Sequence, residues 1–479
     1  MSPRRKPRAA AIFDLDRTLL SGASGPVISE ALRDAGVLPP GRVPGESLLF
    51  GLFNLVGENW PTMMLTRQGA RATKGWSVPA VRAAGEAAAV ELDARVLPYA
   101  KGLLAEHRAE GRLLVLATTT PHDVIAPLAE RLGMDHVIAT RYHNDGETYD
   151  GTIDGEFVWG KGKAREVRHW AEAEQIDLSA SYGYSDSYYD VPLLSIVGHP
   201  YAVNPDPRLA VIAPLRRWPI VWFDVPPGVP KLGWLEPQTA LLQFVRPELF
   251  PFVRFRIYGT EHIPASGAAI LAGNHRSYFD PIAIGLALTE RGRPVRFLGK
   301  KEVFDAPVVG DLARAMGGIR VERGTGSDAP LKAAEDALAA GDLVALMPQG
   351  TIPRGKEFFN PVLKGRWGAM KLAHATGAPV IPIGLWGTEK VWPRSSRVPL
   401  VQNVIDPPTV TVRVGPPVEI GGVSLDADTK KLMKAITALL PPEARRKREP
   451  TEAELALTIP AGSRARSAEA EAERRPGSD

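Results

Sequence analysis

Two aspartates directly follow an apolar run near the start of the chain. Asp14 and Asp16 come after Ala9–Phe13, which has the composition of a buried β-strand. Side chains two residues apart in a strand point to the same side, and the carboxyl end of a parallel strand opens onto a crevice. Two carboxylates held close together favour a divalent cation with oxygen ligands, such as Mg²⁺. We therefore expect a metal-dependent site at the end of this strand.

Further polar side chains lie at strand ends and helix starts in the same part of the chain. A second acidic pair, Asp186 and Asp190, follows the predicted strand Tyr182–Tyr184. Thr118 ends another predicted strand, and Lys163 opens a predicted helix. An acidic pair, a hydroxyl, a lysine and a second acidic pair in this order indicate one site assembled from distant segments.

This series resembles the haloacid dehalogenase (HAD) superfamily, in particular its phosphoserine phosphatase-like class with an α-helical cap inserted after the first strand. The resemblance covers residues of about 10–224. It implies that Asp14 attacks phosphorus as the nucleophile and forms an aspartyl-phosphate, while Asp16 acts as general acid and then as base. Thr118 and Lys163 would hold the phosphoryl oxygens, with Lys161 as an alternative to the lysine because both precede the same helix.

The same resemblance implies a bound Mg²⁺ that screens the repulsion between nucleophile and phosphate. Its expected ligands are acidic side chains from both pairs, namely Asp14, Asp16, Asp186 and Asp190. For the first acidic pair taken alone, a capped turn with solvated acids is the alternative interpretation.

A histidine and an aspartate follow a predicted strand in the second half of the chain. His275 and Asp280 are five residues apart, so on one regular helix they would point about 140° away from each other. They can meet only if His275 lies in a loop and Asp280, followed by Pro281, begins the helix. A histidine oriented by a carboxylate is a general base. The alternative is that Asp280 only caps the helix and His275 is a polar loop residue.

The block Asn274–Asp280 resembles the NHxxxxD motif of the glycerolipid (1-acylglycerol-3-phosphate) acyltransferases. Three later blocks resemble the family's other motifs in the expected order, and the resemblance covers about 255–420; the blocks are Gly317–Arg323, Pro348–Thr351 and Val380–Ile383. The resemblance implies that His275 deprotonates an acceptor hydroxyl, that Asp280 orients it, and that the hydroxyl attacks an acyl-CoA thioester. It also implies a substrate-binding set of Asn274, Arg323, Gly350 and Thr351, with Arg323 holding the acceptor's phosphate.

The third motif departs from the family pattern. The family usually has Glu-Gly-Thr-Arg, whereas this chain has Gln349 and Ile352 at the two charged positions. Arg354 lies two residues further on and is the candidate to bind substrate in place of the missing arginine. Acyl transfer remains the expected reaction, and the identity of the acceptor stays open between lysophosphatidate, another lyso-lipid and a glycolipid.

Length and composition limit the remaining possibilities. The chain has 479 residues, 44% of them hydrophobic, which predicts two to four globular domains. It contains no cysteine, which excludes disulfides, thiolate metal sites and cysteine nucleophiles. The formal net charge of +4 is too small to indicate nucleic acid as a partner.

The element pattern predicts two unrelated α/β modules. Alternating strands and helices indicate a doubly wound Rossmann-like domain with an inserted helical cap, followed by a separate α/β acyltransferase domain. The expected divisions are a basic arm over 1–8, the phosphatase domain over 9–224 with its cap at about 25–95, a proline-rich linker over 225–237, the acyltransferase domain over 238–445 and a disordered tail over 446–479.

Membrane contact is expected without a membrane span, because no run of 18 uncharged apolar residues occurs. The stretch Ala240–Tyr258 is rich in Leu, Phe and Val and indicates an interfacial element, with domain packing as the alternative. A cationic cluster would attract anionic headgroups, with a solvated surface as the alternative; its members are Arg291, Arg293, Arg296, Lys300 and Lys301.

The fused arrangement resembles actinobacterial proteins that join a phosphoserine phosphatase-like domain to an acyltransferase domain. We expect a bifunctional enzyme of phospholipid synthesis, cytoplasmic and peripheral on the inner face of the cell membrane. Its expected substrates are acyl-CoA, a lyso-phospholipid and a phosphomonoester. The alternative is that one domain is catalytically silent and serves as a membrane-docking or regulatory module.

Overall fold

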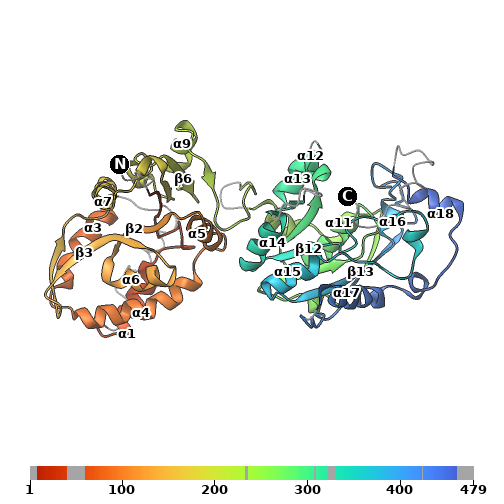
Figure 1. Cartoon of the computed structure of the whole chain (residues 1–479), viewed down its shortest axis with the longest axis horizontal. Helices are drawn as coiled ribbons and strands as arrows, with labels where there is room; N and C mark the ends of the chain where they lie inside the picture. Colours follow the sequence, from red (N-terminus) through yellow and green to blue (C-terminus); the bar gives the residue numbers. More distant parts are fainter. Residues whose placement is uncertain are drawn as a thin grey trace, which may run out of the picture. The chain divides into compact units, whose positions relative to one another are not determined.

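A computed structural model describes residues 8–39, 60–231, 236–306, 309–321, 329–422 and 424–460. The chain divides into two compact units, residues 1–227 and 228–479. Each unit is built on one seven-stranded sheet with helices packed on both faces (Figure 1). The expected fold class, a Rossmann-like α/β domain with a helical cap followed by a second α/β domain, is confirmed.

In the first unit the strand order is β4-β3-β2-β1-β5-β6-β7, and every pairing is parallel except β3 with β4. The central strand β1 has β2 on one side and β5 on the other, so the chain order reverses beside it, which is where crevices form in such sheets. The strands are β1 (Ala10–Phe13), β2 (Leu113–Pro121), β3 (His136–Asn144), β4 (Tyr149–Asp154), β5 (Tyr182–Ser185), β6 (His199–Val203) and β7 (Ile220–Val221).

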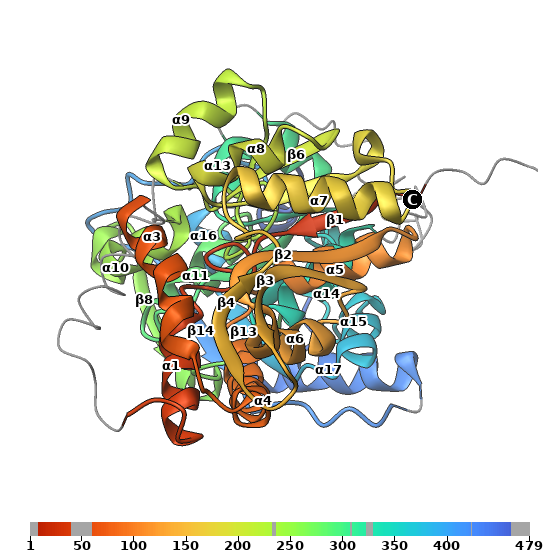
Figure 2. The same ribbon diagram turned by 90° about the vertical axis from the view of Figure 1, so that its left-hand side faces the viewer.

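Alternate residues of β1 pack into two different hydrophobic clusters, one on each face of the sheet. Ala11 and Phe13 pack into the cluster shared with α1, α4 and α6, whereas Ala10 and Ile12 pack into the cluster shared with α7. Figure 2 shows α7 on one side of this sheet and α4 and α6 on the other. The helices are α1 (Gly25–Asp34), α3 (Trp60–Gly69), α4 (Val78–Ala94), α5 (Ala100–Ala109), α6 (His122–Arg131), α7 (Lys161–Ala173), α8 (Val191–Leu194) and α9 (Pro207–Leu215).

The segment between β1 and β2 is helical where the structure describes it, as expected for a cap. The longest of its helices, α4, begins at a serine whose hydroxyl accepts from the backbone N–H of Ala80. Short 3₁₀ turns complete this unit, namely η1 (Ala70–Thr73), η2 (Leu178–Ala180) and η3 (Tyr188–Asp190).

In the second unit the strand order is β11-β10-β12-β9-β13-β14-β8, parallel throughout except for β13 with β14. The sequence pattern predicts the four central strands and β11 but not β8 or β14. The strands are β8 (Arg254–Tyr258), β9 (Ala269–Gly273), β10 (Val295–Lys300), β11 (Ile319–Val321), β12 (Leu343–Leu346), β13 (Val380–Trp386) and β14 (Thr409–Val414).

Helices cover both faces of this second sheet. α11 packs on one face, and α14, α15 and α17 pack on the other. The helices are α10 (Pro237–Phe244), α11 (Asp280–Thr289), α12 (Lys301–Asp305), α13 (Val309–Ala315), α14 (Ala329–Ala339), α15 (Gly368–Thr376), α16 (Thr388–Val391), α17 (Leu425–Leu439) and α18 (Glu452–Leu457), with the 3₁₀ turns η4 (Pro247–Leu249), η5 (Thr260–His262), η6 (Gly355–Phe359) and η7 (Pro442–Arg445).

Part of the segment expected to be disordered is folded, which corrects the boundary at 446. α18 lies within it and begins with a capping box, in which Thr451 and Glu454 exchange side-chain and backbone hydrogen bonds. Thr458 is 3% exposed and accepts from the backbone N–H of Gly355 at 2.9 Å. Composition does not reveal this helix, because contacts with a distant loop stabilise it. Residues 461–479 and 1–7 lie outside the described residues.

Candidate active sites

The first site lies where β1 and β5 end. The backbone N–H of Asp14 donates to the carbonyl of Tyr184 at 2.9 Å, which continues the pairing of the two strands by one residue. Asp14 is therefore fixed at the carboxyl edge of the sheet, and it is 7% exposed. Asp186 follows the end of β5 and is 5% exposed. Because neighbouring parallel strands end at the same edge of the sheet, the two acidic pairs lie close together.

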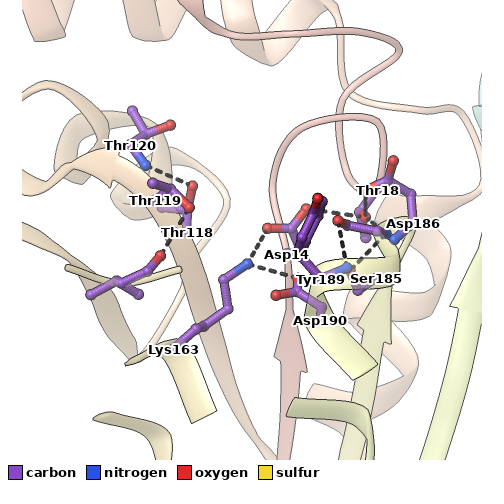
Figure 3. Close-up of polar contacts among 12 residues, drawn as sticks. Asp14, Thr18, Thr118, Thr119, Thr120, Lys163, Ser185, Asp186, Tyr189 and Asp190 are labelled. Atoms are coloured by element: carbon purple, nitrogen blue, oxygen red, sulfur yellow. Dashed lines mark hydrogen bonds and ion pairs between the residues drawn. The ribbon is translucent and has the colours of Figure 1, made fainter. Parts of the chain in front are cut away.

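A buried lysine connects the two acidic pairs. Lys163 is fully buried, and its Nζ lies 2.8 Å from Asp14 Oδ1 and 2.7 Å from Asp190 Oδ2. Figure 3 shows this side chain reaching from α7 between the two carboxylates. Because an unpaired buried charge is costly, the two carboxylates keep the lysine charged and in place. Lys161, the alternative lysine, is exposed at the start of α7.

A threonine hydroxyl links Asp14 with Asp186. Thr18 Oγ1 lies 3.3 Å from Asp14 Oδ2 and 3.4 Å from Asp186 Oδ1, and it accepts from the backbone N–H of Asp186 at 2.9 Å. Two carboxylates that share one hydroxyl present the hard oxygen donors that Mg²⁺ prefers. One carboxylate oxygen nearby, Asp190 Oδ1, is buried without a hydrogen-bond partner. The residues present therefore fit a divalent cation.

The four expected metal ligands do not converge as one cluster. Within the described ranges, no group of three or more histidine, aspartate or glutamate side chains is arranged to hold a metal ion. The carboxylate of Asp16 accepts from the backbone N–H of Ser24 at 2.7 Å, and that of Asp190 binds Lys163 and accepts from Ser185 Oγ at 2.8 Å. Of the four, Asp14 and Asp186 are the two carboxylates that share a contact, through the hydroxyl of Thr18.

Asp16 sits at the boundary between strand end and cap. Burial raises the pKa of Asp16, although the hydrogen bonds from Ser24, which precedes α1, act in the opposite direction. A raised pKa keeps a larger fraction of the carboxyl protonated near neutral pH. This environment suits a group that must donate a proton.

Thr118 lies at the carboxyl end of the neighbouring strand β2. It is 2% exposed, and its Oγ1 accepts from the backbone N–H of Thr120 at 3.2 Å. In Figure 3 Thr118 is on the opposite side of Lys163 from Asp186. The expected hydroxyl and lysine thus come from two different elements, β2 and α7.

Arg17 is a site residue that the sequence interpretation overlooked. Its φ of 60° is left-handed, a conformation that is uncommon for any residue with a side chain. Its Nε lies 3.3 Å from Asp186 Oδ2, while its Nη1 is buried without a hydrogen-bond partner. In the sequence, only the position of Arg17 between Asp16 and Thr18 indicates that it belongs to the site.

The second site lies at the carboxyl ends of β9, β12 and β13. His275 is in the loop after β9, and its Nδ1 lies 2.8 Å from Asp280 Oδ2. Asp280 is fully buried, and its carboxylate also accepts from Thr388 Oγ1 at 2.6 Å and from the backbone N–H of Ser277 at 2.8 Å. The helix α11 begins at Asp280 itself. The aspartate therefore both starts the helix and orients the histidine.

The second ring nitrogen of His275 is available for chemistry. Within the part of the chain that the structure describes, Nε2 has no hydrogen-bond partner, and the side chain is 18% exposed. In the neutral tautomer whose Nδ1–H donates to Asp280, Nε2 carries the lone pair. An imidazole held in this way can accept a proton from an incoming hydroxyl.

Asn274 does not face a substrate, contrary to the expectation. Its Nδ2 donates to the carbonyl of Leu385 at 2.9 Å, and its Oδ1 accepts from the backbone N–H of the same residue at 2.7 Å. Asn274 is 1% exposed. Both halves of its amide are committed to joining β9 to β13, so Asn274 positions the following residue, His275.

Gln349 from the altered third motif contacts the histidine loop. Its Oε1 accepts from the backbone N–H of His275 at 2.7 Å. A neutral amide oxygen therefore makes a contact that requires an acceptor but no charge. Beside it, Gly350 has a φ of +72°, and Thr351 Oγ1 lies 3.4 Å from the Nζ of Lys300. Arg323 lies outside the described residues.

The expected cationic cluster is largely structural, which corrects the headgroup interpretation. Arg296 is 2% exposed and bonds to Glu236 and Asp342, so it cannot face a membrane. Arg291 and Arg293 donate to backbone carbonyl groups. The stretch Ala240–Tyr258 forms α10, η4 and β8, with Phe244 and Leu249 exposed. None of the described helices is long and apolar enough to cross a membrane.

Comparison with known proteins assigns the two units separately. Residues 11–195 match the family described as haloacid dehalogenase-like hydrolase, and residues 254–386 match the family described as acyltransferase. The "Inhibition of morphological differentiation protein" of Streptomyces azureus is 36% identical over 225 residues, covering 46% of this chain and 80% of that protein. The chain belongs to the haloacid dehalogenase-like hydrolases.

Further similarities concern one unit of this haloacid dehalogenase-like hydrolase at a time. Phosphoserine phosphatase SerB1 of Mycobacterium tuberculosis (strain ATCC 25618 / H37Rv) is 34% identical over 228 residues, covering 47% of this chain and 74% of that protein. The solved structure of the 1-acyl-sn-glycerophosphate (LPA) acyltransferase PlsC from Thermotoga maritima is 22% identical, with a TM-score of 0.32, and covers 42% of this chain and 78% of that one. The two family matches show that the protein is an enzyme with a hydrolase domain and an acyltransferase domain.

Proposed function

We propose that the protein is a bifunctional enzyme of phospholipid synthesis. One site is a Mg²⁺-dependent phosphomonoester hydrolase, and the other transfers an acyl group from acyl-CoA to the hydroxyl of 1-acylglycerol 3-phosphate (lysophosphatidate). The observation that carries the proposal is that each unit has its own set of reactive side chains at the carboxyl ends of its strands. Lys163 sits between Asp14 and Asp190 in one unit, and His275 is bonded to Asp280 in the other.

In the hydrolase unit, Asp14 attacks phosphorus while Lys163 and Thr118 hold the phosphoryl oxygens. Asp16 donates a proton to the leaving oxygen and then takes one from the attacking water, for which its raised pKa is suited. Asp14 and Asp186 would hold Mg²⁺, which lowers the repulsion between two anions when it is bound. Asp190 and Ser185 keep Lys163 in position.

In the acyltransferase unit, His275 Nε2 takes the proton of the acceptor hydroxyl as its oxygen attacks the thioester carbonyl. The carbon–sulfur bond then breaks, and the thiolate of CoA leaves with the proton from the imidazolium. Asp280 stabilises the imidazolium, because its buried carboxylate is fixed by hydrogen bonds from Thr388 and Ser277. No enzymic nucleophile is required.

One observation favours a second candidate acceptor. Ile352 is 3% exposed and stands where the related enzymes usually have an arginine, so one expected phosphate ligand is missing. A glycolipid without phosphate would need no such cation, and the phosphodiester of another lyso-lipid has a smaller negative charge than the phosphomonoester of lysophosphatidate. A catalytically silent acyltransferase unit that docks on membranes is the remaining alternative. The exposed Phe244 and Leu249 support peripheral contact of this cytoplasmic enzyme with the membrane, where its lipid substrates lie.

The experiment is a screen of lyso-lipid and glycolipid acceptors with labelled acyl-CoA and Mg²⁺, with phosphate release measured in parallel. The parent protein, Asp14→Asn and His275→Ala are compared. We expect Asp14→Asn to lose phosphate release only and His275→Ala to lose acyl transfer only. Absence of acyl transfer by the parent protein with every acceptor would contradict the acyltransferase half. We also propose that the two sites act in succession on one lipid: the acyltransferase unit forms phosphatidate, and the hydrolase unit then removes its phosphate to give diacylglycerol. Release of phosphate from small phosphomonoesters but not from phosphatidate would contradict this coupling.

A further inference from the structure

A buried arginine near the second site lacks an acidic partner. Arg394 is 6% exposed, its Nη1 donates to the backbone carbonyl of Ile352, and its Nε is buried without a hydrogen-bond partner. Among the described residues, no carboxylate forms an ion pair with it. Burying a charged guanidinium without an anion is costly, so such a group usually has a ligand.

A second arginine lies close to the first. Burial lowers the pKa of Arg394, and the positive charge of Arg354 lowers it further, with Tyr278 acting in the opposite direction. Two guanidinium groups near enough to repel each other favour an anion that can bind both. Arg276 on the histidine loop is neutralised by Glu389, which it contacts through two hydrogen bonds of 3.0 and 2.9 Å.

The C-terminal helix fixes the two arginine-bearing loops relative to each other. Thr458 Oγ1 accepts from the backbone N–H of Gly355, the residue after Arg354, at 2.9 Å. The carbonyl of Leu457 accepts from the backbone N–H of Ser395, the residue after Arg394, at 3.3 Å. One short segment thus holds both loops, which limits the freedom of two like charges to move apart.

The same loop is attached to the histidine loop of the second site. Ser277, two residues after His275, donates through its Oγ to the carbonyl of Trp392 at 2.6 Å. The ring of Tyr278 packs edge-on against that of Trp392, with centroids 5.8 Å apart. Arg394 follows Trp392 by two residues, so the loop that bears Arg394 is joined to the loop that bears His275.

We propose that Arg394 and Arg354 bind the phosphate group of a substrate of the acyltransferase site, and that they take the place of the arginine missing at Ile352. The inference rests on the proposed acyl-transfer function. The phosphate belongs either to the acyl acceptor or to CoA, and the two sources are separable by kinetics. The acceptor is the source that the missing arginine indicates.

The kinetic test compares Arg394→Gln with Arg397→Gln, a matched control at an exposed position of the same loop. For Arg394→Gln we expect the KM for lysophosphatidate to rise about 10- to 100-fold, the loss typical of one charged hydrogen-bond partner, with the KM for acyl-CoA unchanged. Transfer to monoacylglycerol, which has no phosphate, should be the same in both variants. A rise in the KM for acyl-CoA alone would assign the phosphate to CoA. Equal effects on charged and neutral acceptors would overturn the proposal.

A binding measurement keeps the proposal testable if acyl transfer is absent. Calorimetry with glycerol 3-phosphate in an Asp14→Asn background, which prevents hydrolysis, should show a binding event, separate from any binding at the hydrolase site, that Arg394→Gln removes and Arg397→Gln retains. If Arg394→Gln does not fold, as judged by the hydrogen exchange of β9 and β13, Arg354→Gln serves in its place. Unchanged binding in the variant would overturn the proposal, whereas loss of binding without any acyl transfer by the parent would contradict only the proposed reaction.

Discussion

Burial raises the pKa of Asp16, so the loss of this carboxyl should affect substrates differently according to their leaving groups. A protonated Asp16 matters most when the leaving alkoxide is a strong base. Asp16→Asn should therefore lower hydrolysis of an alkyl phosphate by about 10²- to 10⁴-fold. Its effect on p-nitrophenyl phosphate, whose leaving phenolate needs little protonation, should be much smaller. Steady-state rates with both substrates check this, and equal losses would contradict the role of general acid.

Arg17 and a divalent cation would bind the same carboxylate. The guanidinium contacts Asp186 Oδ2, and the left-handed backbone of Arg17 suits glycine better than any residue with a Cβ. In Arg17→Gly, Mg²⁺ should raise the unfolding temperature at lower concentrations than in the parent, since no side chain competes for Asp186. Arg17→Lys retains a cation and is the control. An unchanged dependence on Mg²⁺ would show that Arg17 does not compete.

At the residue scale, the sequence was informative wherever a polar side chain directly follows a strand. Asp14 and Asp186 lie together because the parallel strands β1 and β5 end at a common edge. His275 meets Asp280 because the loop after β9 leads into a helix that begins at Asp280. The contacts of Gln349 with His275 and of Arg394 with Ile352 join residues more than forty positions apart through loops. No local pattern encodes such contacts, since loop conformation decides them.

At the element scale, a buried histidine links α5 to the central sheet of the first unit. Burial lowers the pKa of His107 to about 4, and the charge of Arg112 adds to the effect. Its Nε2 lies 2.9 Å from the hydroxyl of Tyr184 on β5. Because the folded-state pKa is below the ordinary value of 6.5, the stabilising contribution is complete above pH 6.5 and is lost as pH falls towards 4.

We expect the free energy of unfolding of the first unit to fall by about 3 kcal/mol over this range through His107 alone, from 1.36 kcal/mol per pKa unit. His107→Gln cannot be protonated there and should lack this part of the acid dependence. Native-state hydrogen exchange of β1 and β5 between pH 7 and 4 measures the difference. Parallel curves for parent and variant would contradict the assignment.

The short helix α18 should be needed for the geometry of the loop that follows β12. Replacing Thr458 by valine leaves the backbone N–H of Gly355 without its acceptor, which costs about 1–3 kcal/mol. Thr458→Ser keeps the hydroxyl and is the control. Hydrogen exchange in peptides that contain Gly355 should become faster in the valine variant only. No change in exchange would show that the helix does not hold this loop.

The elements that sequence could predict are those with strong local patterns. The buried central strands are continuous apolar runs, and each was expected where it lies. The edge strand β8 and its neighbour β14 mix arginine or threonine with apolar residues, since one of their faces is partly exposed. α18 has six residues, too few for a helix that is stable alone, and depends on Thr458 and on its capping box.

At the scale of the whole molecule, two units with separate sheets and separate reactive side chains share one chain. If the two sites act independently, their losses of activity should also be independent. Independent losses of the two activities distinguish a bifunctional enzyme from an enzyme in which one unit only docks on membranes.

The most direct test is one assay of both reactions on the same preparations of parent, Asp14→Asn and His275→Ala, with lysophosphatidate, labelled acyl-CoA and Mg²⁺. The account predicts that Asp14→Asn accumulates labelled phosphatidate without phosphate release, and that His275→Ala forms no labelled phosphatidate yet still hydrolyses phosphomonoesters. Formation of labelled phosphatidate by His275→Ala at the parent's rate would contradict the account, and so would the absence of any labelled lipid product, phosphatidate or diacylglycerol, from the parent.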